Sequence, residues 1–235
     1  MTNVLLLGSG PNVVAAAEWA VDQFDHIVVI NNAWRVHSDW SHLVHPSDFP
    51  ADRMPPYLKP SQTVVQAKDY VPLQNQYGGF VYAGGTMAFT ASYWALAALK
   101  PTVIAVLGCD MVYPKTEKTH FYGTGTADPL RDDKTLRNLE AKSARLMIKA
   151  AQQGCAMINL SSNESRLVFP RASVEDCATK LPEPFDGVLA SRAEAEEARL
   201  GYYVPTGKYW KEEERFDVDA IDALDTLWLR SAQRP

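Results

Sequence analysis

The feature that most constrains the fold lies in the first dozen residues, where an apolar run over residues 4–7 is followed at once by Gly8-Ser9-Gly10-Pro11-Asn12. Four consecutive apolar residues are typical of a strand that is buried on both faces, as in a parallel sheet. The two glycines permit a tight turn, and the proline suits the first position of a helix, which we expect to end near Val21. The sequence therefore predicts a strand–turn–helix unit.

The turn after this strand is the first candidate ligand site. The unpaired N–H groups and the positive dipole end of the expected helix would lie above Gly10, and both favour a phosphate. The next expected strand ends in Asn31 and Asn32, whose side-chain amides both donate and accept hydrogen bonds. These amides suit a phosphate, a sugar hydroxyl or the edge of a base.

A dinucleotide site would require two features that the chain lacks. The Gly-x-Gly-x-x-Gly fingerprint needs a glycine where Val13 stands. An NAD enzyme ends its second strand in Asp or Glu, whereas this chain has Asn31. These two positions disfavour NAD. A glycine turn that binds no ligand stays open as an alternative, because such turns are common.

Composition indicates one large α/β domain. The chain has 235 residues, 46% of them hydrophobic, which is enough for such a domain with an appendage. A net charge of -5 gives no general attraction to nucleic acid, so we expect no nucleic-acid partner. Three widely spaced cysteines indicate a reducing compartment, and no signal peptide or bilayer-spanning run is evident. We therefore expect a cytoplasmic protein without a transmembrane segment.

The hydrophobic pattern predicts an α/β, Rossmann-like, doubly wound and mostly parallel sheet with helices on both faces. The expected strands cover residues 4–7, 26–30, 63–65, 102–107 and 156–160. The expected helices cover residues 11–21, 87–99, 134–153, 190–200 and 219–229. Residues 34–60 show little periodicity, so we interpret them as a long excursion above the sheet.

Two parts of the chain differ in character. Residues 1–170 form the expected Rossmann-like nucleotide-binding domain. Residues 171–235 are expected to form a helical C-terminal extension that packs on this domain or on another subunit. Between them, the polar stretch of about residues 113–133 contains glycines and is a candidate lid over a site.

Polar residues follow several of the expected strands. Asp110 follows the strand of residues 102–107, and Ser161 and Ser162 follow the strand of residues 156–160. In open α/β folds, ligands bind at the carboxyl edge of the sheet, where such residues gather. Asp110 could hold a ribose or a metal there, although capping the loop is the commonest role for such a residue.

Two further groups of residues bear on the chemistry. Gly85 and Thr86 form a second flexible turn that opens the expected apolar helix of residues 87–99. The histidines and aspartates of residues 37–48 lie close together, but their spacing fits no zinc pattern, so we expect no metal site.

These stretches together resemble bacterial sialyltransferases that use CMP-sialic acid. The resemblance covers residues 1 to about 170. The matching motifs are Gly8-Ser9-Gly10-Pro11-Asn12, Ile30-Asn31-Asn32 at the same spacing, His45-Pro46-Ser47, Gly85-Thr86, Gly108 with Asp110 and Tyr113, and His120-Phe121. Ser9 and His45 stand where the family has asparagines near the donor, and Tyr113 falls one residue late.

The resemblance implies metal-independent transfer of a sugar from a CMP-type nucleotide donor to the hydroxyl of a small-molecule or glycan acceptor, without a cofactor. His120 would be the general base, and Tyr113 and Tyr122 would hydrogen-bond the departing phosphate. The donor-binding residues are expected to be Gly8, Ser9, Gly10, Asn12, Asn31, Asn32, Gly85, Thr86, Asp110, Ser161 and Ser162. A homo-oligomer is compatible with the sequence.

Two alternatives stay open. Similar glycine turns occur in proteins that resemble archaeal 6-hydroxymethylpterin diphosphokinases, which would use ATP and magnesium. The domain could also bind a nucleotide without catalysing a reaction. In the first case we expect Asp110 to be essential, and in the second case His120 and Asp110 would both be dispensable.

Overall fold

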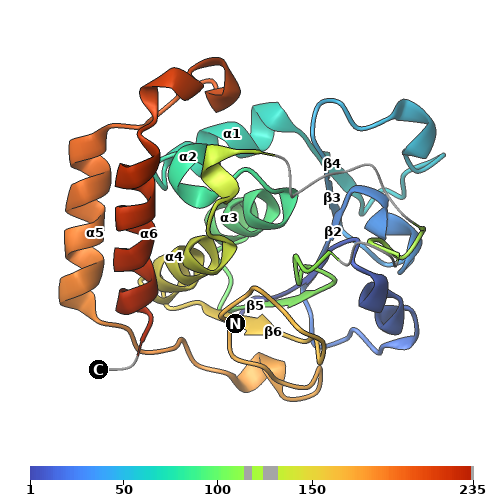
Figure 1. The fold of residues 1–235 in the computed structure, drawn as a ribbon. Coiled ribbons are helices and arrows are strands. Elements are labelled where there is room, and N and C mark those ends of the chain that lie inside the picture. Colours follow the sequence, from blue (N-terminus) through green and yellow to red (C-terminus); the bar gives the residue numbers. More distant parts are fainter. Residues whose placement is uncertain (114–117, 124–131, 234–235) are drawn as a thin grey trace.

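The computed structural model describes residues 1–113, 118–123 and 132–233, and within them the strands form one sheet in the order β4-β3-β2-β1-β5-β6 (Figure 1). Each neighbouring pair of strands is parallel. The strands are β1 (Asn3–Leu7), β2 (His26–Ile30), β3 (His42–Val44), β4 (Thr63–Val65), β5 (Val103–Leu107) and β6 (Ala156–Asn159). The predicted α/β, Rossmann-like fold is confirmed.

The strand order reverses at β1. The chain runs outward from β1 through β2 and β3 to β4, and then crosses back so that β5 pairs with the other side of β1. The turns after β1 and β5 are therefore neighbours at the carboxyl edge, and the chain leads away from them in different directions. Open α/β sheets bind ligands at this kind of switch point.

The two faces of the sheet are covered differently. Alternate residues of β1 point to opposite faces, so that Val4 and Leu6 join one core cluster and Leu5 and Leu7 the other. The helices on the first face are α1 (Ala67–Asn75), α2 (Phe80–Ala83), α3 (Met87–Leu99) and α4 (Leu139–Ala151). The second face is covered by 3₁₀-helices, which include η1 (Pro11–Glu18), η2 (Asn31–Arg35) and η5 (Cys177–Thr179).

The segment after β1 is shorter and tighter than predicted. It is the 3₁₀-helix η1, which ends at Glu18, and not an α-helix to Val21. Val13 donates its N–H to the carbonyl of Gly10, three residues earlier. Val13 and Ala16, also three residues apart, are both buried, as expected when residues at this spacing lie in line on a 3₁₀-helix.

Three other segments differ from the prediction. Residues 34–60 contain the strand β3 as well as a short helical turn, the 3₁₀-helix η3 (Ala51–Arg53), so they are not only an excursion above the sheet. Helix α1, which was not predicted, follows β4 and carries Pro72 in its interior, a residue that usually breaks helices. The helix expected over residues 134–153 is divided into η4 (Lys134–Leu136) and α4, because the Asn138 side chain accepts the N–H of Ala141 and caps α4.

The C-terminal extension forms two long helices, α5 (Gly187–Leu200) and α6 (Val218–Ser231), which lie side by side, with α6 packed against α4 (Figure 1). Short 3₁₀-helices, η6 (Tyr209–Lys211) and η7 (Glu213–Arg215), connect them. Arg145 on α4 pairs with Glu197 on α5 at 2.6 Å, and both side chains are almost completely buried. Trp228 on α6 donates its indole N–H to the same carboxylate at 2.8 Å.

A second buried pair strengthens this attachment. Lys142 on α4 lies 2.7 Å from Asp225 on α6, and each side chain is 1% exposed. The extension therefore shares the core of the domain through buried charges as well as apolar contacts.

Cys109, Cys155 and Cys177 are buried free thiols. In the described ranges, no helix has the length and apolar character needed to cross a bilayer.

We predict that Glu197→Gln destabilises the protein by about 3–5 kcal/mol, because it leaves the Arg145 guanidinium buried without a counter-charge. The matched control is Glu196→Gln on the same helix, which removes an exposed pair with Arg199 and should change stability little. Urea unfolding followed by circular dichroism measures both. Equal effects of the two substitutions would contradict the assigned role of the buried pair.

Candidate functional site

The glycine corner after β1 packs directly on the turn after β5. The N–H of Gly8 donates to the carbonyl of Leu107, and the N–H of Gly10 donates to the carbonyl of Gly108, both at 2.8 Å. A Cβ atom on Gly8 would lie 2.3 Å from the Gly108 oxygen. These glycines are thus required for close backbone contact, and their own N–H groups are paired with carbonyls and are not free to hold a phosphate. That the N–H groups of the following helix hold a phosphate above Gly10 stays a prediction.

Hydrogen bonds join the carboxyl ends of β1, β5 and β6. Nδ2 of Asn12 donates to Asp110 Oδ2 and to Ser161 Oγ, both at 2.8 Å. Ser161 Oγ in turn donates to Asp110 Oδ2 at 2.7 Å. Three of the predicted donor-binding residues, one from each turn, therefore form one network, which we call the Asp110 network.

Asn159, the last residue of β6, completes this network and was not predicted from the sequence. Its Nδ2 lies 3.4 Å from Asp110 Oδ1, and its Oδ1 accepts the N–H of Ser161 at 2.9 Å. The Asp110 carboxylate thus accepts from three side chains, which agrees with a role in holding the turns together. In the sequence, the signal for Asn159 was an amide side chain at the end of an otherwise apolar strand.

The described part of the expected lid contacts the glycine corner. The N–H of Phe121 donates to the carbonyl of Ser9 at 3.1 Å, and the Ser9 hydroxyl lies 3.3 Å from the carbonyl of Ile30. His120 and Gly123 pair with each other in a tight antiparallel turn. Residues 114–117 and 124–131, the other parts of the expected lid, lie outside the described residues.

The three predicted catalytic side chains are neighbours. The ring of His120 stacks on that of Tyr122, with centroids 5.0 Å apart, and lies 6.4 Å from the ring of Tyr113. His120 is 8% exposed, and its Nδ1 is 2.9 Å from the Thr119 hydroxyl. The turn of residues 118–123 therefore brings an imidazole and two phenols together beside Ser9.

Burial sets the protonation of this cluster. Desolvation lowers the pKa of His120 below its usual 6.5, so the ring is neutral at pH 7. Burial, with the nearby Cys109 and Asp110, raises the pKa of Tyr113 well above 10, so its hydroxyl keeps its proton. The cluster thus pairs a proton acceptor with a hydrogen-bond donor.

Several buried polar atoms at the same edge have no hydrogen-bond partner within the described chain. They are Oδ1 of Asn12, Oδ1 of Asn31, Oδ1 of Asn32 and Nε2 of His45, which follow β1, β2 and β3. Asn31 also has a φ of 53°, in the left-handed region that asparagine tolerates better than most residues. Buried polar groups are normally paired, so these atoms make this edge a candidate place for a ligand.

The remaining predicted residues lie in other surroundings. The N–H of Gly85 donates to Thr135 Oγ1 at 3.0 Å, and a Cβ atom there would lie 2.0 Å from the Tyr209 hydroxyl. Thr86 uses its hydroxyl to cap α3 by accepting the N–H of Phe89. Ser162 is exposed after β6. The second glycine turn is thus covered by the C-terminal extension.

Within the described ranges, no three His, Cys, Asp or Glu side chains form a group able to hold a metal ion.

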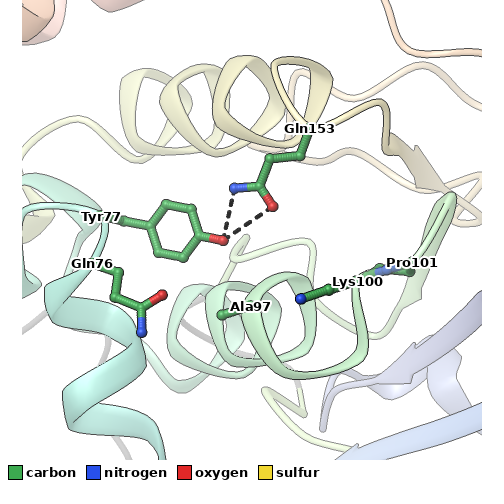
Figure 2. A pocket seen from close by; sticks show the side chains of 6 residues that line it. All are labelled: Gln76, Tyr77, Ala97, Lys100, Pro101 and Gln153. Carbon is green, nitrogen blue, oxygen red and sulfur yellow. Dashed lines mark hydrogen bonds between the residues drawn. The ribbon is translucent and has the colours of Figure 1, made fainter.

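A cavity lies away from the carboxyl edge. It has a volume of about 270 Å³ and is lined by residues around Tyr77 and Gln153, whose side chains hydrogen-bond each other (Figure 2). Its Lys100 and Pro101 precede the amino end of β5, at the opposite edge of the sheet.

Comparisons of this chain with family models, with curated proteins and with solved structures found no match. The candidate ligand site at the carboxyl edge is therefore defined by its geometry and chemistry. The Asp110 network, the turn of residues 118–123 and the unpaired amides and imidazole are its three parts.

We predict that Gly8→Ala destabilises the protein by about 1–3 kcal/mol or more, because the added methyl group overlaps the Gly108 carbonyl. Gly187→Ala is the matched control, since a Cβ atom at Gly187 meets no atom within 4 Å. Thermal unfolding of both variants tests the contact. A Gly8→Ala protein as stable as the control would show that the two turns do not pack closely.

Proposed function

We propose that this protein is a sialyltransferase-like glycosyltransferase that transfers a sugar from a CMP-type nucleotide donor to an acceptor hydroxyl. The reaction would use side chains alone, without a metal ion. The observation that carries the proposal is the contact between the turn bearing His120 and the glycine corner, through Phe121 and Ser9. It places a neutral imidazole beside the strand ends that hold the unpaired amides.

In the proposed reaction, His120 takes the proton of the acceptor hydroxyl as its oxygen attacks the anomeric carbon of the donor. The bond between that carbon and the phosphate oxygen breaks, and CMP leaves with the bonding electron pair. The protonated Tyr113 hydroxyl would donate a hydrogen bond to the departing phosphate, where negative charge increases. Tyr122, stacked on the imidazole, would orient it and add a second donor.

The surroundings of Asp110 bear on the magnesium-dependent alternative. Its carboxylate already accepts hydrogen bonds from Asn12, Ser161 and Asn159. Its Oδ2 already accepts two of these hydrogen bonds, so a magnesium ion could use only the remaining lone pair of Oδ1 without displacing a donor. This observation favours the glycosyltransferase over a diphosphokinase.

We predict that His120→Ala lowers sugar transfer and donor hydrolysis by about 10²–10⁴-fold while CMP binding stays nearly unchanged. The substitution removes the base but leaves the amides and the Asp110 network intact. Transfer from CMP-N-acetylneuraminate to a lactose acceptor and calorimetric titration of CMP are the two measurements. His26→Gln is the control, since His26 lies at the amino end of β2, on the opposite edge.

An unchanged rate in His120→Ala would remove the histidine from the mechanism. A thermal-shift panel of CMP, CDP, UDP, ATP and NAD, each with and without magnesium, identifies the nucleotide independently. At about 100-fold excess over its Kd, a true ligand stabilises the protein by about 2.7 kcal/mol. Stabilisation by ATP only with magnesium would favour the diphosphokinase instead.

We predict that the acidic limb of the kcat/KM profile has its midpoint below pH 6.5. The imidazole acts as a base only when it is neutral, and burial lowers the pKa of His120 below that value. Activity should therefore persist at mildly acidic pH and fall as the pH passes below the lowered pKa. Initial rates between about pH 4.5 and about pH 8.5, roughly two units on either side of the usual histidine pKa, test this, and a midpoint above pH 6.5 would contradict the assignment.

A further inference from the structure

The ends of β2 and β3 form a corner whose unpaired polar atoms indicate which chemical group can bind there. Asn31 follows Ile30, His45 follows Val44, and Ile30 and Val44 are register partners in neighbouring parallel strands. Asn31 and His45 therefore stand side by side at the carboxyl edge. Asn32 is next in the chain and 3% exposed. We call these three residues the β2–β3 corner.

The hydrogen bonding of His45 determines the character of its free nitrogen. Nδ1 of His45 lies 2.8 Å from the carbonyl oxygen of Pro46. Because a carbonyl oxygen only accepts hydrogen bonds, Nδ1 must carry the proton of a neutral ring. Nε2 then presents a lone pair, and it is buried with no partner in the described chain.

The two amides add acceptors of the same kind. Oδ1 of Asn31 and Oδ1 of Asn32 are also buried without partners in the described ranges. At the neighbouring end of β1, Asn12 is oriented by Asp110, which can only accept its Nδ2, so Oδ1 of Asn12 is likewise a free acceptor. A buried acceptor without a partner costs folding free energy, so four at one edge favour a ligand that supplies donors there.

A phosphate does not complement these atoms, because its ionised oxygens only accept hydrogen bonds. A group that donates hydrogen bonds does complement them. In a nucleotide sugar such groups are the exocyclic amine of the base and the hydroxyls of the ribose or the transferred sugar. A contact of Asn31 with the phosphate would therefore have to come from its Nδ2, because its buried Oδ1 needs a donor.

We infer that the β2–β3 corner binds the hydrogen-bond-donating part of the ligand, an amine or a hydroxyl, and that the phosphate lies elsewhere at the edge. His45 is then a specificity-determining residue, which sequence reasoning noted only as a departure from the family motif. The inference rests on the proposed function only in taking the ligand to be a nucleotide sugar. The polarity of the corner is independent of the reaction.

The first test needs no ligand. If the acceptors are free for binding, Asn32→Leu should leave the melting temperature of the protein unchanged or raise it, because it removes an unpaired amide oxygen. Asn138→Leu is the matched control. Oδ1 of Asn138 accepts the N–H of Ala141 at 3.0 Å, so its removal should lower the melting temperature.

The second test measures binding by calorimetry with CMP, UMP, CMP-N-acetylneuraminate and inorganic phosphate. We expect His45→Phe to weaken nucleotide-sugar binding about tenfold, the loss expected for one or two hydrogen bonds. Inorganic phosphate should bind wild type and variant equally. A loss with CMP but not with UMP identifies the base amine as the donor, and a loss only with the CMP sugar identifies the sugar hydroxyls.

Three outcomes overturn the inference. The first is a lower melting temperature for Asn32→Leu together with unchanged binding of the CMP sugar to His45→Phe, which makes the acceptors internal structural groups. The second is a loss of inorganic phosphate binding in His45→Phe. The third is stabilisation of wild type, but not of His45→Phe, by zinc or magnesium chloride alone. If nucleotide binding depends on the corner but no sugar is transferred, the proposed function fails and this inference is supported.

Discussion

The contact between the glycine corner after β1 and the turn after β5 is the constraint on which the rest of the structure depends. Gly8 and Gly10 donate their N–H groups to the end of β5, and neither position has room for a side chain. This contact holds the two turns together where the strand order reverses. Because the turns are adjacent, Asn12 reaches Asp110, and through it the end of β6. The glycines therefore build the site by packing rather than by binding phosphate.

The C-terminal extension takes part in the domain to which it is attached. Buried charges on α4 pair with α5 and α6, and such pairs are costly to leave incomplete. Lys134, just after the expected lid, donates to the carbonyls of Glu213 and Phe216. The Tyr209 hydroxyl donates to Asp133 at 2.7 Å. The residues that follow the expected lid are therefore held by a segment that comes much later in the chain, since Lys134 is 79 residues from Glu213 and 82 from Phe216.

Sequence patterns predicted those elements whose burial is continuous. The strand after Thr102 and the helix from Met87 to Leu99 were predicted nearly to the residue, because an apolar run bounded by glycine or proline leaves few alternatives. Strand β3 was missed because three residues are too few to show a period. Helix α1 was missed because it contains a proline. Candidate polar residues were found by their position after strands, but Asn159 was missed since it ends a strand.

The sequence by itself determined the fold class, since short apolar runs that alternate with helical patterns are typical of a parallel sheet covered by helices. It also determined which polar residues follow the strands. Only the tertiary structure decided which of them meet, because strand order and register are properties of the whole sheet. It joined Asn12 to Asp110 and Ser161, and left the acceptors of Asn31, Asn32 and His45 unpaired. It also covered Gly85 with Tyr209, a contact between residues far apart in the chain that no local pattern encodes.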